Sequence, residues 1–164
     1  PDFWSAYVFW RDKAKRSWLI GDFTVQYGQG LSCWQSMSFG TGSDLAAVKR
    51  QGSVVRLYQS VGESRFMRGV SVGKLEGRWQ WHAFLSAHPQ SATLYEMPSL
   101  GKVFRQLDAS GLHRTALENS KKNALYEYTA GGRIGTVSPT GKVFFNAVAR
   151  SWSLPRAEIG RAHV

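Results

Sequence analysis

Residues 65–87 read RFMRGVSVGKLEGRWQWHAFLSA, and this stretch decides the expected fold. Its second half alternates between two sets of side chains, Trp79, Trp81, Ala83 and Leu85 against Gln80, His82, Phe84 and Ser86. Successive side chains of a β-strand point to opposite faces, so the alternation predicts a strand with one apolar and one mostly polar face. Phe84 is the exception on the polar face. The dipeptide Glu76-Gly77 before it predicts a tight turn, and therefore a hairpin of residues 65–75 and 78–87.

Six strand-like runs in the chain are rich in aromatic or β-branched residues and are bounded by turn residues. They are residues 3–10, 17–27, 65–75, 78–87, 126–137 and 142–154. Short connections join them in pairs: residues 11–16, Glu76-Gly77, and Ser138-Pro139-Thr140-Gly141. The sequence therefore predicts three antiparallel hairpins.

Two much longer segments, residues 28–64 and 88–125, separate the three hairpins. Antiparallel strands that cross a slab place successive connections on opposite sides, so the short turns are expected on one side and the long segments on the other. That layout is typical of outer-membrane barrels. We therefore expect a mainly β chain, an antiparallel meander of about six strands that forms an open fragment of an outer-membrane-type β-barrel with a helical insertion.

Two other strands show faces of different polarity. In residues 17–27, the side chains expected to face lipid are Leu19, Phe23, Val25 and Tyr27, and those expected to face water are Asp22, Thr24 and Gln26. In residues 126–137, the corresponding sets are Tyr126, Tyr128, Ala130 and Ile134 against Glu127, Thr129 and Arg133. Aromatic residues make up 13% of the chain and include seven Trp, and no apolar run is long enough for a transmembrane helix. The core of a soluble β-sandwich is the alternative interpretation.

The helical insertion is expected at about residues 98–124. Leu100, Val103, Phe104 and Leu107 have helical spacing, and Gly111 is expected to end that helix. Thr115-Ala116-Leu117-Glu118 resembles a capping box, which predicts a second helix towards Asn123. We interpret this segment as a packed helical loop or a plug.

The net charge of +10 predicts acidic partners, such as lipopolysaccharide, anionic lipid or nucleic acid, although a solvated basic surface is the simpler explanation. The candidate contacts to an anion or partner are Lys49, Arg50, Arg56, Arg105, His113, Arg114, Lys121 and Lys122. Lys49, Arg50 and Arg56 are also candidates to pair with a lumen carboxylate such as Asp22. No catalytic constellation emerges, and the histidines lack metal-ligand spacing, so we expect neither an enzyme nor a cofactor or metal site. Cys33 is the single cysteine.

Several motifs across residues 18–154 resemble one family. They are the stretch GDFTVQYGQGL at 21–31, Ser43-Asp44 followed by Val48-Lys49-Arg50, and Gly111-Leu112-His113-Arg114-Thr115 with Lys122-Asn123. They are similar to helix-hairpin-helix domain-containing proteins of Gram-negative bacteria, in which a competence-like DNA-binding module precedes a large outer-membrane-like β region. The resemblance implies an outer-membrane location and a lipid bilayer or lipopolysaccharide as partner. The helix-hairpin-helix module itself is not in this chain, so nucleic acid is an expected partner only through a missing upstream module.

Residues 1–157 are thus expected to be a partial β-barrel region with a structural or transport-related role. Residues 158–164 resemble a translated sequencing adapter and are expected not to be native. Pro1 in place of Met suggests that an export signal lies upstream. An open sheet of this kind is expected to aggregate when expressed alone. The alternative functions are a nucleic-acid-binding protein and a soluble β-sandwich that binds glycans through Trp79 and Trp81.

Overall fold

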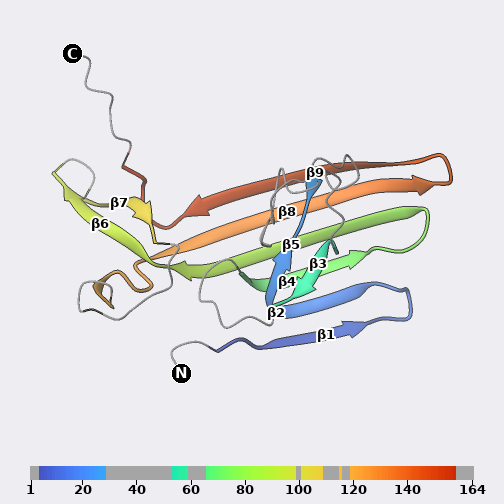
Figure 1. The fold of residues 1–164 in the computed structure, drawn as a ribbon, viewed down its shortest axis with the longest axis horizontal. Coiled ribbons are helices and arrows are strands. Elements are labelled where there is room, and N and C mark those ends of the chain that lie inside the picture. The colour runs from blue at the N-terminus through green and yellow to red at the C-terminus, as the bar shows by residue number, and fades with distance from the viewer. Residues whose placement is uncertain are drawn as a thin grey trace, which may run out of the picture.

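A computed structural model describes residues 4–28, 53–58, 66–98, 101–108, 115 and 119–157. In these residues the strands are β1 (Tyr7–Arg11), β2 (Ser17–Val25), β3 (Val55–Leu57), β4 (Met67–Lys74), β5 (Trp79–Gln90), β6 (Ala92–Met97), β7 (Gly101–Leu107), β8 (Leu125–Ser138) and β9 (Gly141–Trp152). The larger sheet has the order β1-β2-β4-β5-β8-β9, with β3 paired to β2, and β6 and β7 form a second sheet (Figure 1). All pairings are antiparallel. The predicted mainly β, antiparallel fold is confirmed.

The three predicted hairpins are the pairs β1–β2, β4–β5 and β8–β9. Ser138 pairs with Gly141, so Pro139 and Thr140 alone make the last turn. The turn before β5 contains Gly77, whose φ of 87° lies in the left-handed region that glycine adopts at little cost. Figure 1 shows all three turns at one end of the sheet, while β6 and β7 lie at the other. The turn chemistry in the sequence therefore located these hairpins correctly.

Asp12 organises the turn between β1 and β2. Its Oδ1 accepts hydrogen bonds from the backbone amides of Ala14 and Arg16 at 2.9 and 3.0 Å, and its Oδ2 accepts one from Arg16 Nε at 2.6 Å. The backbone hydrogen bond from Arg16 is the main cause that holds the pKa of the Asp12 carboxyl below its usual value. The charged form of Asp12 thus favours this turn.

The predicted helix over residues 100–107 is wrong, because Gly101–Leu107 is strand β7. The pairing of β6 with β7 shifts register between Thr93 and Leu94, which leaves Arg105 without an opposite residue. Val103 and Phe104 precede this bulge and pair regularly with Tyr95 and Leu94, yet both are buried, and two successive buried residues imitate helical spacing. In the second predicted helix, only Asn119 and Ser120 are described as helical, and residues 116–118 lie outside the described residues. Within the described residues, no helix is long and apolar enough to cross a membrane.

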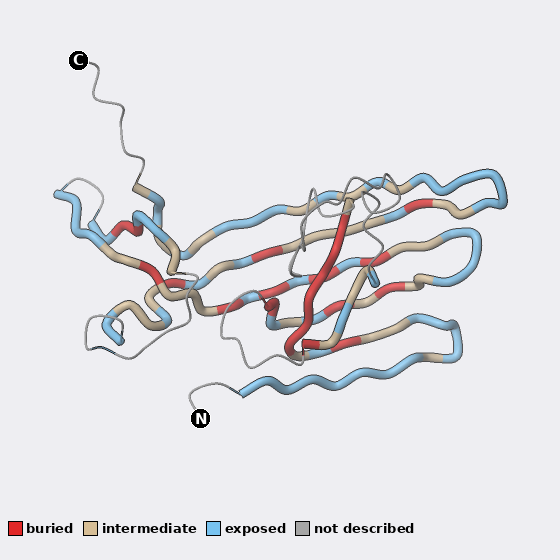
Figure 2. Tube along the Cα trace, viewed as in Figure 1, coloured by how far each residue is buried: buried red, intermediate tan, exposed pale blue. Residues whose placement is uncertain are grey.

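The end of β2 leaves the plane of the sheet and crosses over one of its faces. The change of direction occurs at Gly21, whose φ is 117°, and residues 22–27 beyond it are all buried (Figure 2). The crossing segment packs on β5, where the rings of Phe23 and Phe84 lie 6.2 Å apart, edge to face. β3 lies beside it through Val55 and Leu57.

This crossing corrects the predicted faces of residues 17–27. The four side chains expected to face lipid, Leu19, Phe23, Val25 and Tyr27, are instead buried in the main core together with Met67 and Phe84. Val148 on β9 packs against the same core. Alternation within one strand shows that its faces differ, but it does not show which face is covered by the chain itself.

Replacement of Gly21 tests the bend. A Cβ at Gly21 would lie 2.2 Å from the carbonyl oxygen of Ala6, whereas one at Gly77 would meet nothing within 4 Å. Both glycines have positive φ, so Gly77→Ala is a matched control for the backbone penalty alone. We expect Gly21→Ala to lower the free energy of unfolding by about 1–3 kcal/mol more than Gly77→Ala does. Urea unfolding of the detergent-solubilised chain, followed by tryptophan fluorescence, measures the difference, and equal losses would contradict the bend.

Candidate functional site

The register of the large sheet defines two faces, because residues directly opposite each other share a face. One face, which we call the outer face, has two central rows of side chains. The first row is Val8, Ile20, Val70, Leu85, Ala130 and Ala149, and the second is Trp10, Trp18, Val72, Ala83, Gly132 and Ala147. The opposite face, which we call the inner face, also has two central rows. The first row is Phe9, Leu19, Ser71, Phe84, Gly131 and Val148, and the second is Arg11, Ser17, Gly73, His82, Arg133 and Asn146. Each of these rows crosses six strands.

The outer face is apolar and exposed. Its two central rows contain no charged or hydrogen-bonding side chain except the indoles of Trp10 and Trp18, yet Leu85 is 61% exposed and Ile20 49%. The predicted apolar faces of residues 78–87 and 126–137 both belong to it, since Tyr128 and Ile134 are exposed as well. Water-exposed surfaces of soluble monomers rarely hold a continuous apolar patch larger than a few hundred Å². The outer face is therefore the candidate surface for contact with an apolar partner.

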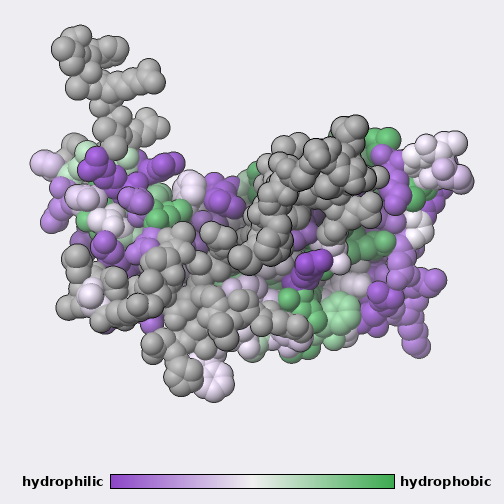
Figure 3. Space-filling view, in the orientation of Figure 1, coloured by the Kyte–Doolittle hydropathy of each residue, from purple (hydrophilic) through white to green (hydrophobic). Residues whose placement is uncertain are grey.

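Aromatic side chains mark both ends of the outer face. Near the hairpin turns lie Trp79, Trp81 and the stacked rings of Trp10 and Trp18, 5.9 Å apart; at the opposite end lie the stacked rings of Tyr126 and Tyr128, 6.3 Å apart. From Trp79 to Ala87 the outer positions of β5 span about 26 Å, at about 3.3 Å per residue. Figure 3 shows hydrophilic side chains gathered beyond this span, at the end that holds the turns.

The inner face has a different character, because it holds buried polar side chains, such as His82 and Ser86, beside the apolar core. His82 and Ser86 on β5 are 3% and 7% exposed, whereas Ala83 and Leu85, which lie between them in the sequence and point to the outer face, are exposed. Arg133 lies with its guanidinium carbon 3.6 Å from the centre of the Phe144 ring, and Arg150 pairs with Glu127 at 3.3 Å. The covered face thus combines an apolar core around Leu19 and Phe84 with buried polar side chains. The open face is apolar, although soluble proteins usually place polar and charged side chains on an open face.

His82 connects two hydroxyl groups on the inner face. Its Nε2 lies 2.7 Å from Ser71 Oγ, and its Nδ1 is in a short hydrogen bond with the hydroxyl of Tyr27 on the crossing segment. A neutral imidazole has one donor and one acceptor nitrogen, so one hydroxyl donates to the ring and the other accepts from it. His82 and Ser71 also line a cavity of about 490 Å³ beneath β3, with Leu19 and Gln80. The crossing segment is therefore tied to the sheet by polar as well as apolar contacts.

Asp22 at the bend is bound by Arg68 on β4. Arg68 Nε donates to Oδ1 at 2.7 Å and Nη2 donates to Oδ2 at 2.9 Å, while the backbone amide of Ala6 donates to Oδ2 at 3.3 Å. The side chain of Asp22 is only 1% exposed, against 44% for Arg68. The partner that the structure shows for Asp22 is Arg68, which was not among the candidates Lys49, Arg50 and Arg56, and two of those, Lys49 and Arg50, lie outside the described residues. Asp22 and Arg68 lie opposite each other in the β2–β4 register, a pairing that no motif in the sequence reveals.

The candidate contacts from the sequence do not form one cluster in the described structure. Arg56 is exposed on β3, and Arg105 is exposed on β7, in the other sheet, with its guanidinium carbon 5.9 Å from the centre of the Tyr95 ring. Lys121 and Lys122 are half-buried in the turn before β8, where the Lys121 carbonyl accepts a hydrogen bond from Ala92. Lys49, Arg50, His113 and Arg114 lie outside the described residues. Among the residues that are described, no group of His, Cys, Asp or Glu could hold a metal ion.

Comparisons with protein-family models, with curated proteins and with solved structures find no match to this chain. The resemblance to helix-hairpin-helix domain-containing proteins stays a prediction.

Replacement of His82 tests the polar link between the crossing segment and the sheet. We expect His82→Leu to lower the free energy of unfolding by about 1–3 kcal/mol, because it leaves two buried hydroxyls without their ring partner. Gln80→Leu is the control on the same strand and face, since the Gln80 amide only donates to the Gly77 carbonyl at 3.3 Å near the surface. Its effect should stay within about 0.5 kcal/mol. Similar losses for the two variants in urea unfolding would argue against the link.

Proposed function

We propose that this chain is part of an outer-membrane β-barrel protein with a structural or transport-related role. The observation that carries the proposal is the exposed outer face, which is apolar and uncharged between two groups of aromatic side chains, while ionisable side chains lie on the covered face beside the apolar core. Lipid-facing strands of outer-membrane barrels have such an apolar band, about 25 Å tall, with aromatic girdles at both interfaces.

The position of charge on the outer face supports the same proposal. Lys74 lies close to the hairpin turns, in the outer-face row that contains Trp81 and Ile134. Arg68 lies near the opposite end of β4. Both are near the ends of the span, where a long cationic side chain reaches the aqueous interface. The resemblance in the sequence implies the same location.

Dilution of the urea-dissolved chain into phosphatidylcholine vesicles tests this function. We expect the chain to float with the vesicles after an alkaline wash and to acquire a β-sheet circular dichroism spectrum there, while dilution into plain buffer gives aggregates. A monodisperse chain that folds cooperatively in buffer and does not float with vesicles would overturn the proposal.

A further inference from the structure

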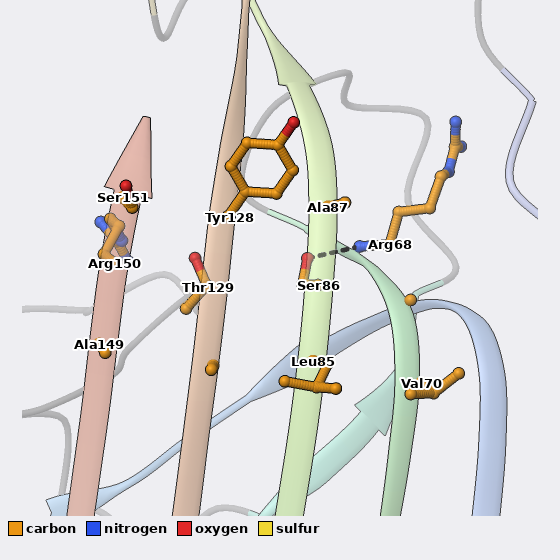
Figure 4. A pocket seen from close by; sticks show the side chains of 12 residues that line it. Arg68, Val70, Leu85, Ser86, Ala87, Tyr128, Thr129, Ala149, Arg150 and Ser151 are labelled. Carbon is orange, nitrogen blue, oxygen red and sulfur yellow. Dashed lines mark hydrogen bonds between the residues drawn. The ribbon is translucent and has the colours of Figure 1, made fainter. Parts of the chain in front are cut away.

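The outer face contains a groove of about 700 Å³ beside Tyr128. Figure 4 shows Val70 and Leu85 at one end of it and Tyr128 at the other, with the small side chains of Ala87 and Ala149 at its sides. The groove exists because the rows here combine large and small residues: Leu85 is followed across the sheet by Ala130 and Ala149, and Tyr128 stands between Ala87 and Ser151.

Two arginines border this groove, and each is already paired with a carboxylate. Arg68 binds both carboxylate oxygens of Asp22, and Arg150 Nε lies 3.3 Å from Oε1 of Glu127. In Figure 4 the guanidinium of Arg68 points away from the groove. An anionic group at this place would therefore meet no unpaired positive charge from either arginine, and the walls offer mainly apolar atoms. The charge balance of the groove fits an uncharged, apolar occupant.

We infer that this groove holds one acyl chain of a bilayer lipid, bound through its hydrocarbon and not through its headgroup. The inference rests on the proposed function, since the groove lies within the outer face. If the groove stayed empty, the side chains that line it, such as Leu85 and Tyr128, would lack van der Waals contacts on one side. A flexible acyl chain in the groove supplies those contacts. The lipid in the groove is then retained more tightly than the lipid around it.

Native mass spectrometry of the chain in detergent, with added dimyristoyl phosphatidylcholine or dimyristoyl phosphatidylglycerol, tests the inference. The variant is Ala149→Leu, which fills the groove, and its matched control is Ala147→Leu, on the same strand and face but outside the lining. Both residues are exposed, so neither change should affect folding. We expect the unaltered chain and Ala147→Leu to retain one phospholipid with either headgroup, and Ala149→Leu to retain about tenfold less.

Three results would overturn the inference: no retained lipid on the unaltered chain, equal retention by the two variants, or a strong preference for the glycerol headgroup. A dimer that Ala149→Leu alone abolishes would also overturn it, because the occupant would then be a second copy. The proposed function is judged separately, by flotation and by the β-sheet spectrum in vesicles. A chain that inserts normally but shows no effect of Ala149→Leu would refute the groove and leave the membrane proposal standing.

Discussion

Replacing Arg68 with Met is expected to lower the free energy of unfolding by about 3–5 kcal/mol, because it leaves the buried carboxylate of Asp22 without its positively charged partner. The Asp22 side chain is 1% exposed and receives two hydrogen bonds from Arg68, of 2.7 and 2.9 Å. Met keeps much of the aliphatic stem of Arg68, so the loss reports the charge more than the packing. Urea unfolding of the vesicle-bound chain, followed by tryptophan fluorescence, measures it.

Asp22→Asn is the informative counterpart of Arg68→Met. It leaves Arg68 without its ion pair, but the Arg68 side chain is 44% exposed and can be hydrated, so a loss of only about 1 kcal/mol is expected. The double variant should be more stable than Arg68→Met alone, since no buried charge remains. If Asp22→Asn cost as much as Arg68→Met, the carboxylate would have to be accessible to water, contrary to the structure.

Leu85→Arg is expected to destabilise the membrane-bound chain by about 1–3 kcal/mol, the cost of a cation on the lipid face at a depth between the bilayer midplane and the interface. Leu85 is 61% exposed on the outer face of β5, between Trp81 and Ala87, and Ala87 lies opposite Tyr128 at the end of the apolar span. In a water-exposed sheet the same exposed position would accept Arg with a change of at most about 0.5 kcal/mol. The size of the loss therefore distinguishes lipid from water at this face.

Thr140→Arg is the control for Leu85→Arg. Thr140 is exposed in the two-residue turn between β8 and β9, beyond the end of the apolar span. An added arginine there is expected to leave the free energy of unfolding within about 0.5 kcal/mol of the unaltered chain. Equal effects of the two arginines in vesicles would count against a lipid-facing surface.

The hairpins and two of the strand faces could be predicted from the sequence because their causes are local. The proline-glycine turn at 138–141 and the glycine at 77 fix where the chain reverses, and both are visible as residue types. In β5 and β8 apolar and polar residues alternate with few exceptions, such as Phe84, so Leu85 and Ile134 were assigned to one apolar face, and both are exposed in the structure.

The features that could not be predicted depend on contacts between distant residues. Gly21 turns β2 across the sheet, which buries Phe23 and Tyr27. A glycine within a strand can mark a bend, but it does not show which way the strand turns or what it packs against. Burial of the successive residues Val103 and Phe104 gave β7 the spacing of a helix. The pairing of Asp22 with Arg68 follows from the adjacency of β2 and β4, whose connecting segment is long and has no turn motif to fix their register.

Spin labels along β5 test the central claim, that the outer face contacts lipid. In a Cys33→Ser background, Ala83→Cys, Phe84→Cys, Leu85→Cys, Ser86→Cys and Ala87→Cys are labelled one at a time, and the chain is reconstituted in phosphatidylcholine vesicles. Collisions with oxygen, which concentrates in the bilayer, are compared with collisions with a water-soluble nickel complex. We expect high oxygen accessibility at positions 83, 85 and 87 and low accessibility at 84 and 86. Greater accessibility of positions 83, 85 and 87 to the nickel complex than to oxygen would contradict the account.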